Sequence, residues 1–573
     1  CLLRFWALSD LLTTCRMKSK HDVRAQQSRR RFLADTALGA AGLGLGAAGM
    51  ESAQARTKWE KMIKGLQTVT TDVLIVGSGA AGTAAAIEAR RSGASVLVIE
   101  KMGSLGGSSI ISRGALAVPR SPMQRAMGID DSPEHFADDL MSSAYCGHPG
   151  RIECLALEAL PTFEWLTNEI GVRWVMDAVG SEIEQSVPRS AIVAGDGAAA
   201  LMMPLLDRAR TLDAEFEVNE KLLHLITRET YDGVAVTGAV VENTRTGLRR
   251  CINVRRGVVL AAGGFAADAP FRQRYNQRLS EHVGTATQPG STSEVLREAA
   301  RIGAWLVHLQ YITCIPDANP VEKGWGTSWQ FSRWCAGAQG LWVERQTGRR
   351  FVNEMSSTAE RTNGVFDVLN ADRDVVAIAD ARAVRHPGSM VFTASDVELL
   401  VSRGFVQKYE TLALLAQACG IPLSNLKVEV ELYNRAITAA REGRTAGSFT
   451  DRLGRPIAPE AELMEEGPWY CAPLLAKVLM CSGGLAIDLK SRVLSVVDDR
   501  PIPGLFAAGE ITGGLNGKGD AGACGLMDAI VFGRIAGREA ARIPKDYSDW
   551  REMNPLVFHQ LIDMERLWTS SAT

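Results

Sequence analysis

The first strongly patterned segment of the chain is residues 72–76, an apolar run that follows a polar linker. Such a run predicts a strand buried on both faces in a parallel sheet. A helical pattern covers residues 83–92, and a second apolar run at 95–99 predicts a neighbouring strand. Strand, helix and strand in this order predict an α/β fold with a mostly parallel sheet.

The turn after the first strand reads Gly77-Ser78-Gly79-Ala80-Ala81-Gly82. In a Rossmann-like dinucleotide-binding unit, Gly77 would permit the tight turn and Gly79 would let the backbone approach a pyrophosphate. Gly82 would let the helix pack closely on the strand, and the helix N-terminus would face the phosphates. Glu100 ends the second strand, where it is placed to accept hydrogen bonds from ribose hydroxyls.

Three further segments combine apolar runs with glycines. They are residues 101–109, with Lys101, Gly106, Gly107, Ser108 and Ser109; residues 256–265, with Ala261 and Gly263; and residues 502–510, which end in Gly509 and Glu510. A helical pattern then starts near Gly525 and Leu526. The set resembles the FAD-binding domain of the fumarate reductase and 3-ketosteroid dehydrogenase superfamily over roughly residues 70–543.

This resemblance implies FAD as the cofactor. Residues 106–109 would lie beside the isoalloxazine ring, and Gly509 and Glu510 would contact the ribityl and ribose region. The helix at Gly525 would point its N-terminus at the flavin N1–C2=O edge, where its partial positive charge stabilises the reduced flavin. Ser108 replaces the histidine that carries flavin covalently in the succinate dehydrogenase branch, so we expect non-covalent FAD.

The resemblance also divides the chain into domains. An N-terminal extension with a signal would occupy residues 1–55. A Rossmann-like FAD-binding domain in two parts, 70–304 and 431–545, would carry an inserted α+β capping domain at 305–430. A tail would follow at 546–573.

Fumarate reductases of this superfamily hold a dicarboxylate with histidines and arginines. The matching positions are Ile315, Thr358, Leu479 and Asp520. Buried carboxylates need charged hydrogen-bond partners, and these residues provide no cation. We therefore expect a substrate that is not a dicarboxylate.

The remaining candidates for catalysis are Tyr470, Arg350, Arg361 and Asp520. Tyr470 is the leading acid or base because tyrosines polarise the carbonyl in ketosteroid dehydrogenases. Arg350 belongs to a segment, 348–354, that either orders the cap or touches the site. Five tryptophans lie in or beside the cap. Each one alone is typical of ordinary core packing, whereas the cluster is also consistent with a large, flat or hydrophobic substrate: Trp305, Trp325, Trp329, Trp334 and Trp342.

The expected reaction is hydride transfer between flavin N5 and a carbon next to an activating carbonyl, as C=C reduction or CH–CH dehydrogenation of an enone or ketosteroid. Three alternatives stay open. They are a fumarate reductase-like protein with a rearranged site, a flavin hydroxylase or oxidase that reacts with oxygen, and a non-catalytic electron-transfer subunit.

Composition narrows the partners. A net charge of −2 gives no field for nucleic acid, and the 11 cysteines form no CxxC or CxxCH motif, so we expect no metal site and no covalent haem. The chain has no second GxGxxG for NAD(P)H, which favours a separate electron carrier such as a cytochrome or quinone. No apolar run is long enough for a membrane span.

The N-terminal region has the layout of a twin-arginine signal. Residues 28–33 read Ser-Arg-Arg-Arg-Phe-Leu, an uncharged Ala/Gly/Leu run covers 37–48, and residues 53–55 offer a small-residue cleavage site. A basic disordered tail is the alternative. We expect export by the twin-arginine machinery to the periplasm.

Overall fold

The computed structural model describes residues 63–544, except 145, 183, 196, 231–232, 390–391, 444–448, 518 and 520–521. The signal-like region, the tail at 546–573 and the candidate Asp520 therefore lie outside the described residues. The chain divides into two compact units, 1–67 and 68–573, and every element below belongs to the second. Within the described part, no helix is long and apolar enough to cross a membrane.

The main sheet has the strand order β18-β19-β8-β1-β2-β5. Its strands are β1 (Thr68–Val76), β2 (Val96–Glu100), β5 (Glu215–Val218), β8 (Arg249–Leu260), β18 (Arg492–Leu494) and β19 (Pro501–Ala507). The pairs of β1 with β2 and β8, and of β8 with β19, are parallel. Val76 pairs with Ile99 and Leu260, so the carboxyl ends of these strands meet at one edge. Ligands bind at this edge of an open α/β sheet.

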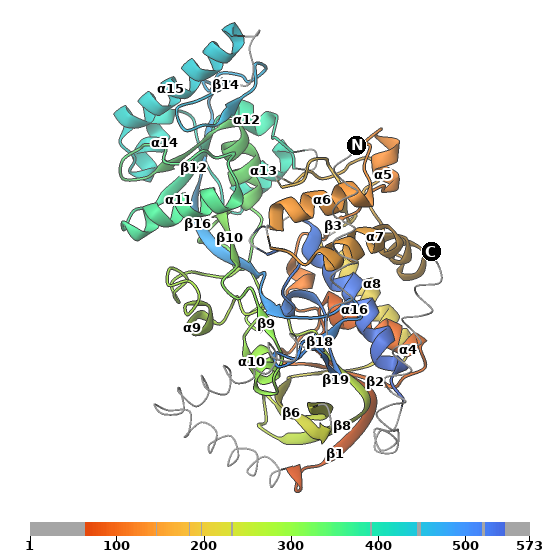
Figure 1. Ribbon diagram of the computed structural model, residues 1–573. Helices are drawn as coiled ribbons and strands as arrows, with labels where there is room; N and C mark the ends of the chain where they lie inside the picture. Colours follow the sequence, from red (N-terminus) through yellow and green to blue (C-terminus); the bar gives the residue numbers. More distant parts are fainter. Residues whose placement is uncertain are drawn as a thin grey trace, which may run out of the picture. The chain divides into compact units, whose positions relative to one another are not determined.

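Two helices pack closely beside this sheet. They are α4 (Ala80–Arg91), which links β1 to β2, and α16 (Cys524–Arg542), which lies along α4 (Figure 1). A Cβ on Gly533 would lie 2.4 Å from the Ala81 carbonyl oxygen, and one on Gly537 would lie 2.2 Å from that of Ala85. The helices approach closely because glycine and alanine face each other.

Other elements surround the core of this domain. The hairpin β6 (Glu220–Thr230) and β7 (Gly233–Asn243) pairs with β8. Helices α6 (Pro133–Ala144), α7 (Pro149–Trp165), α8 (Ala199–Thr211) and α10 (Glu294–Arg301) belong to the same part, as do the paired short strands β3 (Ala115–Ala117) and β4 (Ser190–Ile192).

A second sheet forms the cap, with the order β10-β16-β12-β11 and β13 paired to β16. The strands are β10 (Ile312–Ala318), β11 (Leu341–Glu344), β12 (Val375–Ala379), β13 (Gln407–Tyr409) and β16 (Trp469–Cys481). The cap helices are α11 (Thr358–Asn370), α12 (Ala381–Arg385), α13 (Ala394–Ser402), α14 (Leu412–Cys419) and α15 (Leu423–Glu442). Figure 1 shows this group of helices and strands in green to light blue.

The cap extends further along the chain than expected. The anticipated boundary at residue 430 falls inside α15, which runs without a break to Glu442. Tyr433 and Ile437 on that helix are buried with the cap strands, and β16 pairs with β12. We therefore propose that the insertion ends near Cys481, because α15 and β16 share the cap core.

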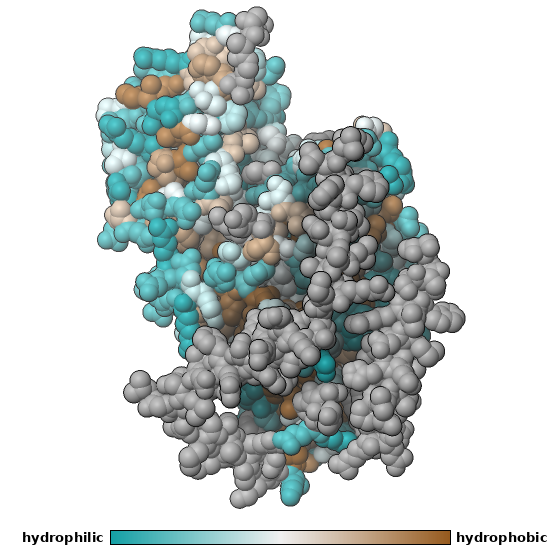
Figure 2. All heavy atoms as spheres, viewed as in Figure 1, coloured by the Kyte–Doolittle hydropathy of each residue, from teal (hydrophilic) through white to brown (hydrophobic). Residues whose placement is uncertain are grey.

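The face of the cap in view carries scattered apolar side chains. Figure 2 shows brown patches over α14 and α15, and Leu414, Val428 and Leu432 on these helices are exposed. Scattered apolar side chains are ordinary at a protein surface. They give no reason to place the functional site on this face.

Candidate functional site

A cavity of about 290 Å³ lies at the carboxyl edge of the main sheet. It is lined by segments within residues 76–81, 99–102, 107–115, 220–222, 261–263, 286–295, 479–482 and 508–529, with Trp325. Strand ends, glycine turns and the start of α16 thus surround one volume. This is where the sequence places a dinucleotide.

The turn after β1 offers backbone rather than side chains to the cavity. Gly77 has φ +108°, and a Cβ there would lie 2.3 Å from the Ala261 carbonyl oxygen. A Cβ on Gly82 would lie 1.9 Å from the Gly77 carbonyl oxygen. Helix α4 begins after Gly79 with no acidic residue and no side-chain cap in its first turn. Its N-terminus therefore suits an anionic phosphate group.

Glu100 holds two loops together at the cavity. Its Oε2 accepts hydrogen bonds from the backbone N–H and the hydroxyl of Ser78, at 3.1 and 2.8 Å. Its Oε1 accepts from the Met102 N–H at 2.9 Å. A carboxylate has about four acceptor positions, so Glu100 can still accept from a ribose hydroxyl.

Two predicted cofactor residues do not line the cavity but shape it. Gly82 packs against the turn at Gly77. Gly106 has φ +104°, and its N–H donates to the Ser78 hydroxyl at 3.0 Å. The other fifteen predicted cofactor residues line the cavity: Gly77, Gly79, Ala80, Ala81, Glu100, Lys101, Gly107, Ser108, Ser109, Ala261, Gly263, Gly509, Glu510, Gly525 and Leu526.

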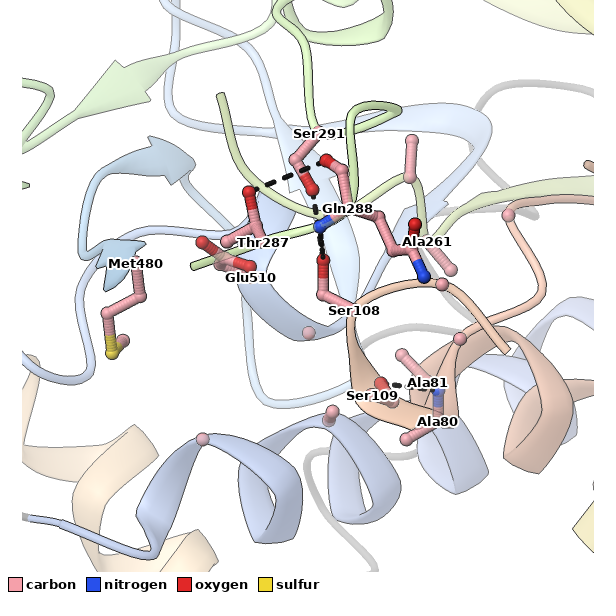
Figure 3. Close-up of a pocket in the computed structure, with 18 of the residues that line it drawn as sticks. Ala80, Ala81, Ser108, Ser109, Ala261, Thr287, Gln288, Ser291, Met480 and Glu510 are labelled. Carbon is pink, nitrogen blue, oxygen red and sulfur yellow. Dashed lines mark hydrogen bonds between the residues drawn. The ribbon is translucent and has the colours of Figure 1, made fainter. Parts of the chain in front are cut away.

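Serines hold the segment after β2 against the cavity wall. The Ser108 hydroxyl accepts from the Gln288 N–H at 3.1 Å and lies 3.1 Å from the Ser291 hydroxyl (Figure 3). The Ser109 hydroxyl accepts from the Ala80 N–H at 3.0 Å. These contacts fix residues 108–109 beside the phosphate-facing turn.

Glu510 is a half-buried residue of the cavity wall. Burial raises the pKa of its carboxyl, and hydrogen bonds from the N–H groups of Cys481 and Gly264 only partly oppose that rise. The Cys481 N–H lies 2.9 Å from Glu510 Oε1. Cys481 ends β16, so this bond ties the cap strand to the turn after β19.

The start of α16 is open toward the cavity. Ala523, before its first residue, has φ +65° and no side chain caps the helix. A Cβ on Gly525 would meet no atom within 4 Å. The positive end of the helix dipole is therefore accessible to a negatively charged ring edge.

Arg151, which sequence reasoning missed, supports this loop from α7. Its Nη2 lies 3.1 Å from Asp528 Oδ1 and donates to the Thr512 hydroxyl at 3.2 Å, and its Nη1 donates to the Gly513 carbonyl. Burial lowers the pKa of Arg151, against the effect of Asp528. The available signal in the sequence was that Arg151 is the only basic residue of α7.

A group of charged and aromatic residues closes the cavity at the cap. Arg113 lines the cavity, and its Nη2 donates to Glu182 Oε1 at 2.7 Å. Its guanidinium carbon lies 5.5 Å from the centre of the Trp325 ring and 5.3 Å from that of Trp329. These distances suit cation–π contacts. Sequence reasoning missed Arg113 and Glu182, because neither belongs to a recognised motif.

Of the tryptophans predicted to mark the substrate region, Trp325 alone lines the cavity within the described part of the chain. Trp329 is buried against it, with ring centres 5.4 Å apart. Trp342 lies in the cap core and donates its indole N–H to the Ser332 carbonyl. Trp305 is 37% exposed at the surface.

A buried charge network lies next to Trp329. Asp317 Oδ2 accepts from Arg333 Nε at 2.8 Å and lies 3.7 Å from Arg361 Nη1. Burial, together with the charge of Arg333, lowers the pKa of Arg361 to about 10. Arg361 donates to the Thr358 hydroxyl at 3.2 Å, which is 3.3 Å from Glu184 Oε1. Burial raises the pKa of Glu184.

Tyr470 does not lie where the sequence prediction needs it. It is buried in β16 opposite Ala379, and its hydroxyl donates to Glu398 at 3.1 Å. It is not part of the cavity wall, which β16 reaches only at Leu479 and beyond. From Tyr470 to Cys481 the strand spans roughly 35 Å at about 3.3 Å per residue. In this arrangement Tyr470 lies away from the cavity, and its role as acid or base stays a prediction.

Arg350 is likewise a cap residue. It forms ion pairs with Glu354 at 2.6 Å and Asp451 at 2.7 Å, and all three side chains are buried. These contacts fit the alternative prediction for residues 348–354, that this segment orders the cap. Arg361 is 1% exposed and does not line the cavity either.

Three of the four positions that match the dicarboxylate ligands lie within the described residues. Ile315 is buried in β10 opposite Lys477, and Thr358 starts α11. Leu479 lines the cavity, where it contributes apolar surface. None of these three gives the cavity a cation.

A parallel sheet with a glycine turn, an acidic strand end and an inserted cap defines a dinucleotide-binding oxidoreductase. Residues 72–526 match the family model described as FAD binding domain, and the chain belongs to that family. FAD is its cofactor, and the resemblance drawn from the motifs is confirmed. The glycine turn and the open helix ends fit this cofactor.

The relatives act on carbon–carbon double bonds. The chain is 31% identical to urocanate reductase of Eggerthella lenta, over 87% of this chain and 79% of that protein. It is 30% identical to the acrylate reductase flavoprotein subunit of Shewanella woodyi, over 84% and 92%. We conclude that the protein is an FAD-dependent oxidoreductase acting on C=C or CH–CH groups.

Solved structures agree with this assignment. A flavocytochrome c3 fumarate reductase in an open conformation matches with a TM-score of 0.71 and 25% identity, covering 85% of this chain and 81% of that one. A 3-ketosteroid-Δ4-(5α)-dehydrogenase from Rhodococcus jostii matches with a TM-score of 0.63 and 26% identity, covering 82% and 97%. The predicted α/β fold with an inserted cap is confirmed.

Proposed function

We propose that the protein reduces a C=C bond conjugated to a carbonyl or carboxyl group in a substrate that is not a dicarboxylate. One observation carries the proposal: where the cavity meets the cap, Trp325 and Leu479 line it beside a lone cation, Arg113, among the described residues. Two buried carboxylates would need more cationic partners than this wall offers.

The reaction divides between cofactor and protein. FAD, when bound and reduced, supplies a hydride to one carbon of the double bond. The neighbouring carbon then takes a proton, so the π bond is replaced by two C–H bonds. The protein orients the substrate on Trp325 and excludes water beneath the cap.

For the proton we propose the hydrogen-bonded series Glu184, Thr358 and Arg361 as a reservoir outside the cavity lining, from which water or a cavity-lining group would pass the proton to the substrate. Glu184 can hold a proton because burial raises its pKa, and the Thr358 hydroxyl connects it to Arg361. This series takes the place proposed earlier for Tyr470. Asp520, outside the described residues, stays a candidate.

Electrons would reach the flavin from a separate carrier. Relatives include cytochrome-type and NADH-dependent fumarate reductases, and quinol-fumarate reductases share the fold. A cytochrome or a quinone remains our proposal for this chain.

Reoxidation of the reduced protein under anaerobic conditions tests the function. Protein reduced by dithionite would be mixed with urocanate, acrylate, fumarate or 4-androstene-3,17-dione, and flavin absorbance would be followed. We expect rapid reoxidation by a conjugated non-dicarboxylate and slow reoxidation by fumarate or air. Fast reoxidation by air alone would favour an oxidase or hydroxylase. No response to any substrate would favour an electron-transfer subunit.

We also propose that FAD is held without a covalent bond, because residue 108 is serine. Acid precipitation should leave all flavin in the supernatant. Flavin that stays with the precipitate would contradict this proposal.

We further propose export to the periplasm through the twin-arginine pathway. The double variant Arg29→Lys, Arg30→Lys keeps the charge and removes the pair that the export receptor reads. It should accumulate in the cytoplasm with FAD bound, as seen by fractionation and flavin fluorescence. Periplasmic protein at the wild-type level would refute the assignment.

A further inference from the structure

We propose that Arg113 binds the carboxylate of the substrate beside Trp325, which makes the substrate a planar α,β-unsaturated monocarboxylate. This inference rests on the proposed function and narrows it. The proposed function also allows a neutral enone or a ketosteroid. Neither carries a carboxylate that Arg113 could bind.

Arg113 differs from the other cations of the cavity in its position, although it too pairs with a carboxylate, that of Glu182, at 2.7 Å. In the part of the chain that the structure describes, the cavity is lined by Lys101, Lys221 and Arg113. Lys101 and Lys221 both pair with Glu294, at 3.2 and 3.4 Å. Glu294 thus holds both lysines at one end of the cavity, the end that Glu100 and its neighbours line. Arg113 is left as the cation at the cap end.

The guanidinium of Arg113 keeps donors for a ligand. Its Nη2 donates to Glu182, and within the described residues Nε and Nη1 have no hydrogen-bond partner. About a quarter of the side chain is exposed, at 26%. Because a guanidinium presents five N–H donors, it can bind Glu182 and a second carboxylate together.

Glu182 fixes the position of this cation. Its side chain is 8% exposed, and a Cβ on Gly522 would lie 2.5 Å from its Oε2. Gln185, from the same segment, donates to the Gly522 carbonyl at 2.7 Å. The loop before α16 therefore holds Glu182, and Glu182 holds Arg113.

The two tryptophans lie beside the guanidinium. Arg113 lies within 5.5 Å of both ring centres, and the rings are tilted by 49° to each other. Arginine presents its donors in a planar fork that suits a carboxylate, a geometry that lysine cannot reproduce. Trp325 lines the cavity as well, so a flat conjugated acid could contact the ring while its carboxylate reaches the guanidinium.

The composition of the wall then selects for one carboxylate. Leu479 and Ala286 line the cavity, and Ile315 is buried with Ala286 in one cluster. A second carboxylate against these side chains would lose its water without gaining a partner. A neutral substrate would leave the donors of Arg113 unused, which disfavours it.

The test compares trans-cinnamate with its methyl ester, two probes of nearly equal shape that differ in charge. Binding to the oxidised FAD-loaded protein would be measured from the flavin absorbance change and, independently, by thermal shift. Turnover would be measured with reduced methyl viologen. The variants are Arg113→Met and Arg113→Lys, with Arg125→Met, an exposed arginine on α5 (Pro122–Ala126), as the matched control.

We expect the wild type and Arg125→Met to bind the acid at least about tenfold more tightly than the ester. Arg113→Met should weaken binding of the acid by about 10- to 100-fold, the loss expected for one charged hydrogen-bonded contact, and leave the ester unchanged. Arg113→Lys should bind the acid more tightly than Arg113→Met but less tightly than the wild type. Unchanged FAD content would show that the variants are folded.

Two results would overturn the inference. One is an undiminished preference for the acid in both Arg113 variants. The other is wild-type reduction of the ester or of 4-androstene-3,17-dione with no response to any monocarboxylate, which would leave the proposed C=C reduction intact. Failure of the wild type with every conjugated substrate would instead refute the proposed function itself, and the inference with it.

Discussion

Single residues around the cavity act largely through what their backbone permits. Gly77 adopts a positive φ against Ala261, and Gly82 packs on Gly77, so side chains are excluded where a pyrophosphate needs room. These requirements are local, and the sequence reveals them because a turn of this kind tolerates few residues. The role of Arg113 depends on Glu182 and Trp325, which are distant in sequence, and no local pattern could predict it.

Gly79→Val should abolish flavin binding. The branched side chain would crowd the Ser109 hydroxyl, which lies 3.3 Å from a Cβ at this position, and would enter the space left for the phosphates. Purified protein should be colourless and poorly soluble by absorbance and yield. Gly150→Ala, in the first turn of α7 and outside the cavity, should stay yellow.

Tyr470→Phe should leave turnover within about twofold of the wild type. The hydroxyl contacts Glu398 in the cap, and loss of such a hydrogen bond costs about 1 kcal/mol of stability or less. Steady-state kinetics with reduced viologen would measure it. A hundredfold fall in kcat would restore Tyr470 as an acid or base.

At the scale of elements, the cap is stabilised by buried ion pairs that cross between its segments. Arg350 joins the loop after β11 to Asp451, and Arg455 lies 3.4 Å from Glu354. The family resemblance implied an inserted cap that ends at residue 430, and that position falls inside α15. Helix α15 and strand β16 belong to the cap through long-range packing, which local periodicity does not report.

Arg350→Met should destabilise the cap by about 3 kcal/mol, because Asp451 and Glu354 would remain buried with less compensation. Limited proteolysis and chemical denaturation would detect the change. Arg385→Met removes an exposed partner of Glu466 and serves as the control, with little expected effect. Equal stability of the two variants would contradict the role of this network.

Glu184→Gln should alter the dependence of stability on pH. Burial raises the pKa of Glu184, although Arg333, Arg361 and Thr358 oppose the rise, so the fold favours the neutral carboxyl. That contribution is complete below about pH 4.5 and is lost as pH rises through the raised pKa. The glutamine variant should therefore gain free energy of unfolding relative to the wild type as pH rises from 4.5 to 7. A difference that stays constant over this range in urea denaturation would rule this out.

At the scale of the whole molecule, the FAD-binding domain and the inserted cap enclose one cavity between strand ends, helix termini and Trp325. The fold and the cofactor followed from motifs spread over the chain, because each motif marks one turn of the same sheet. The part of the cavity that would bind the substrate could not be predicted in this way. Its wall is formed by loops that come together only in the complete fold.

The central claim, reduction of a conjugated C=C bond in a monocarboxylate, is tested most directly by product analysis. FAD-loaded protein would be incubated without oxygen with reduced methyl viologen and urocanate or cinnamate, and the mixture analysed by mass spectrometry. We predict the saturated acid, with two viologen radicals oxidised per molecule formed. Unchanged acid in the presence of bound, reducible flavin would contradict the account.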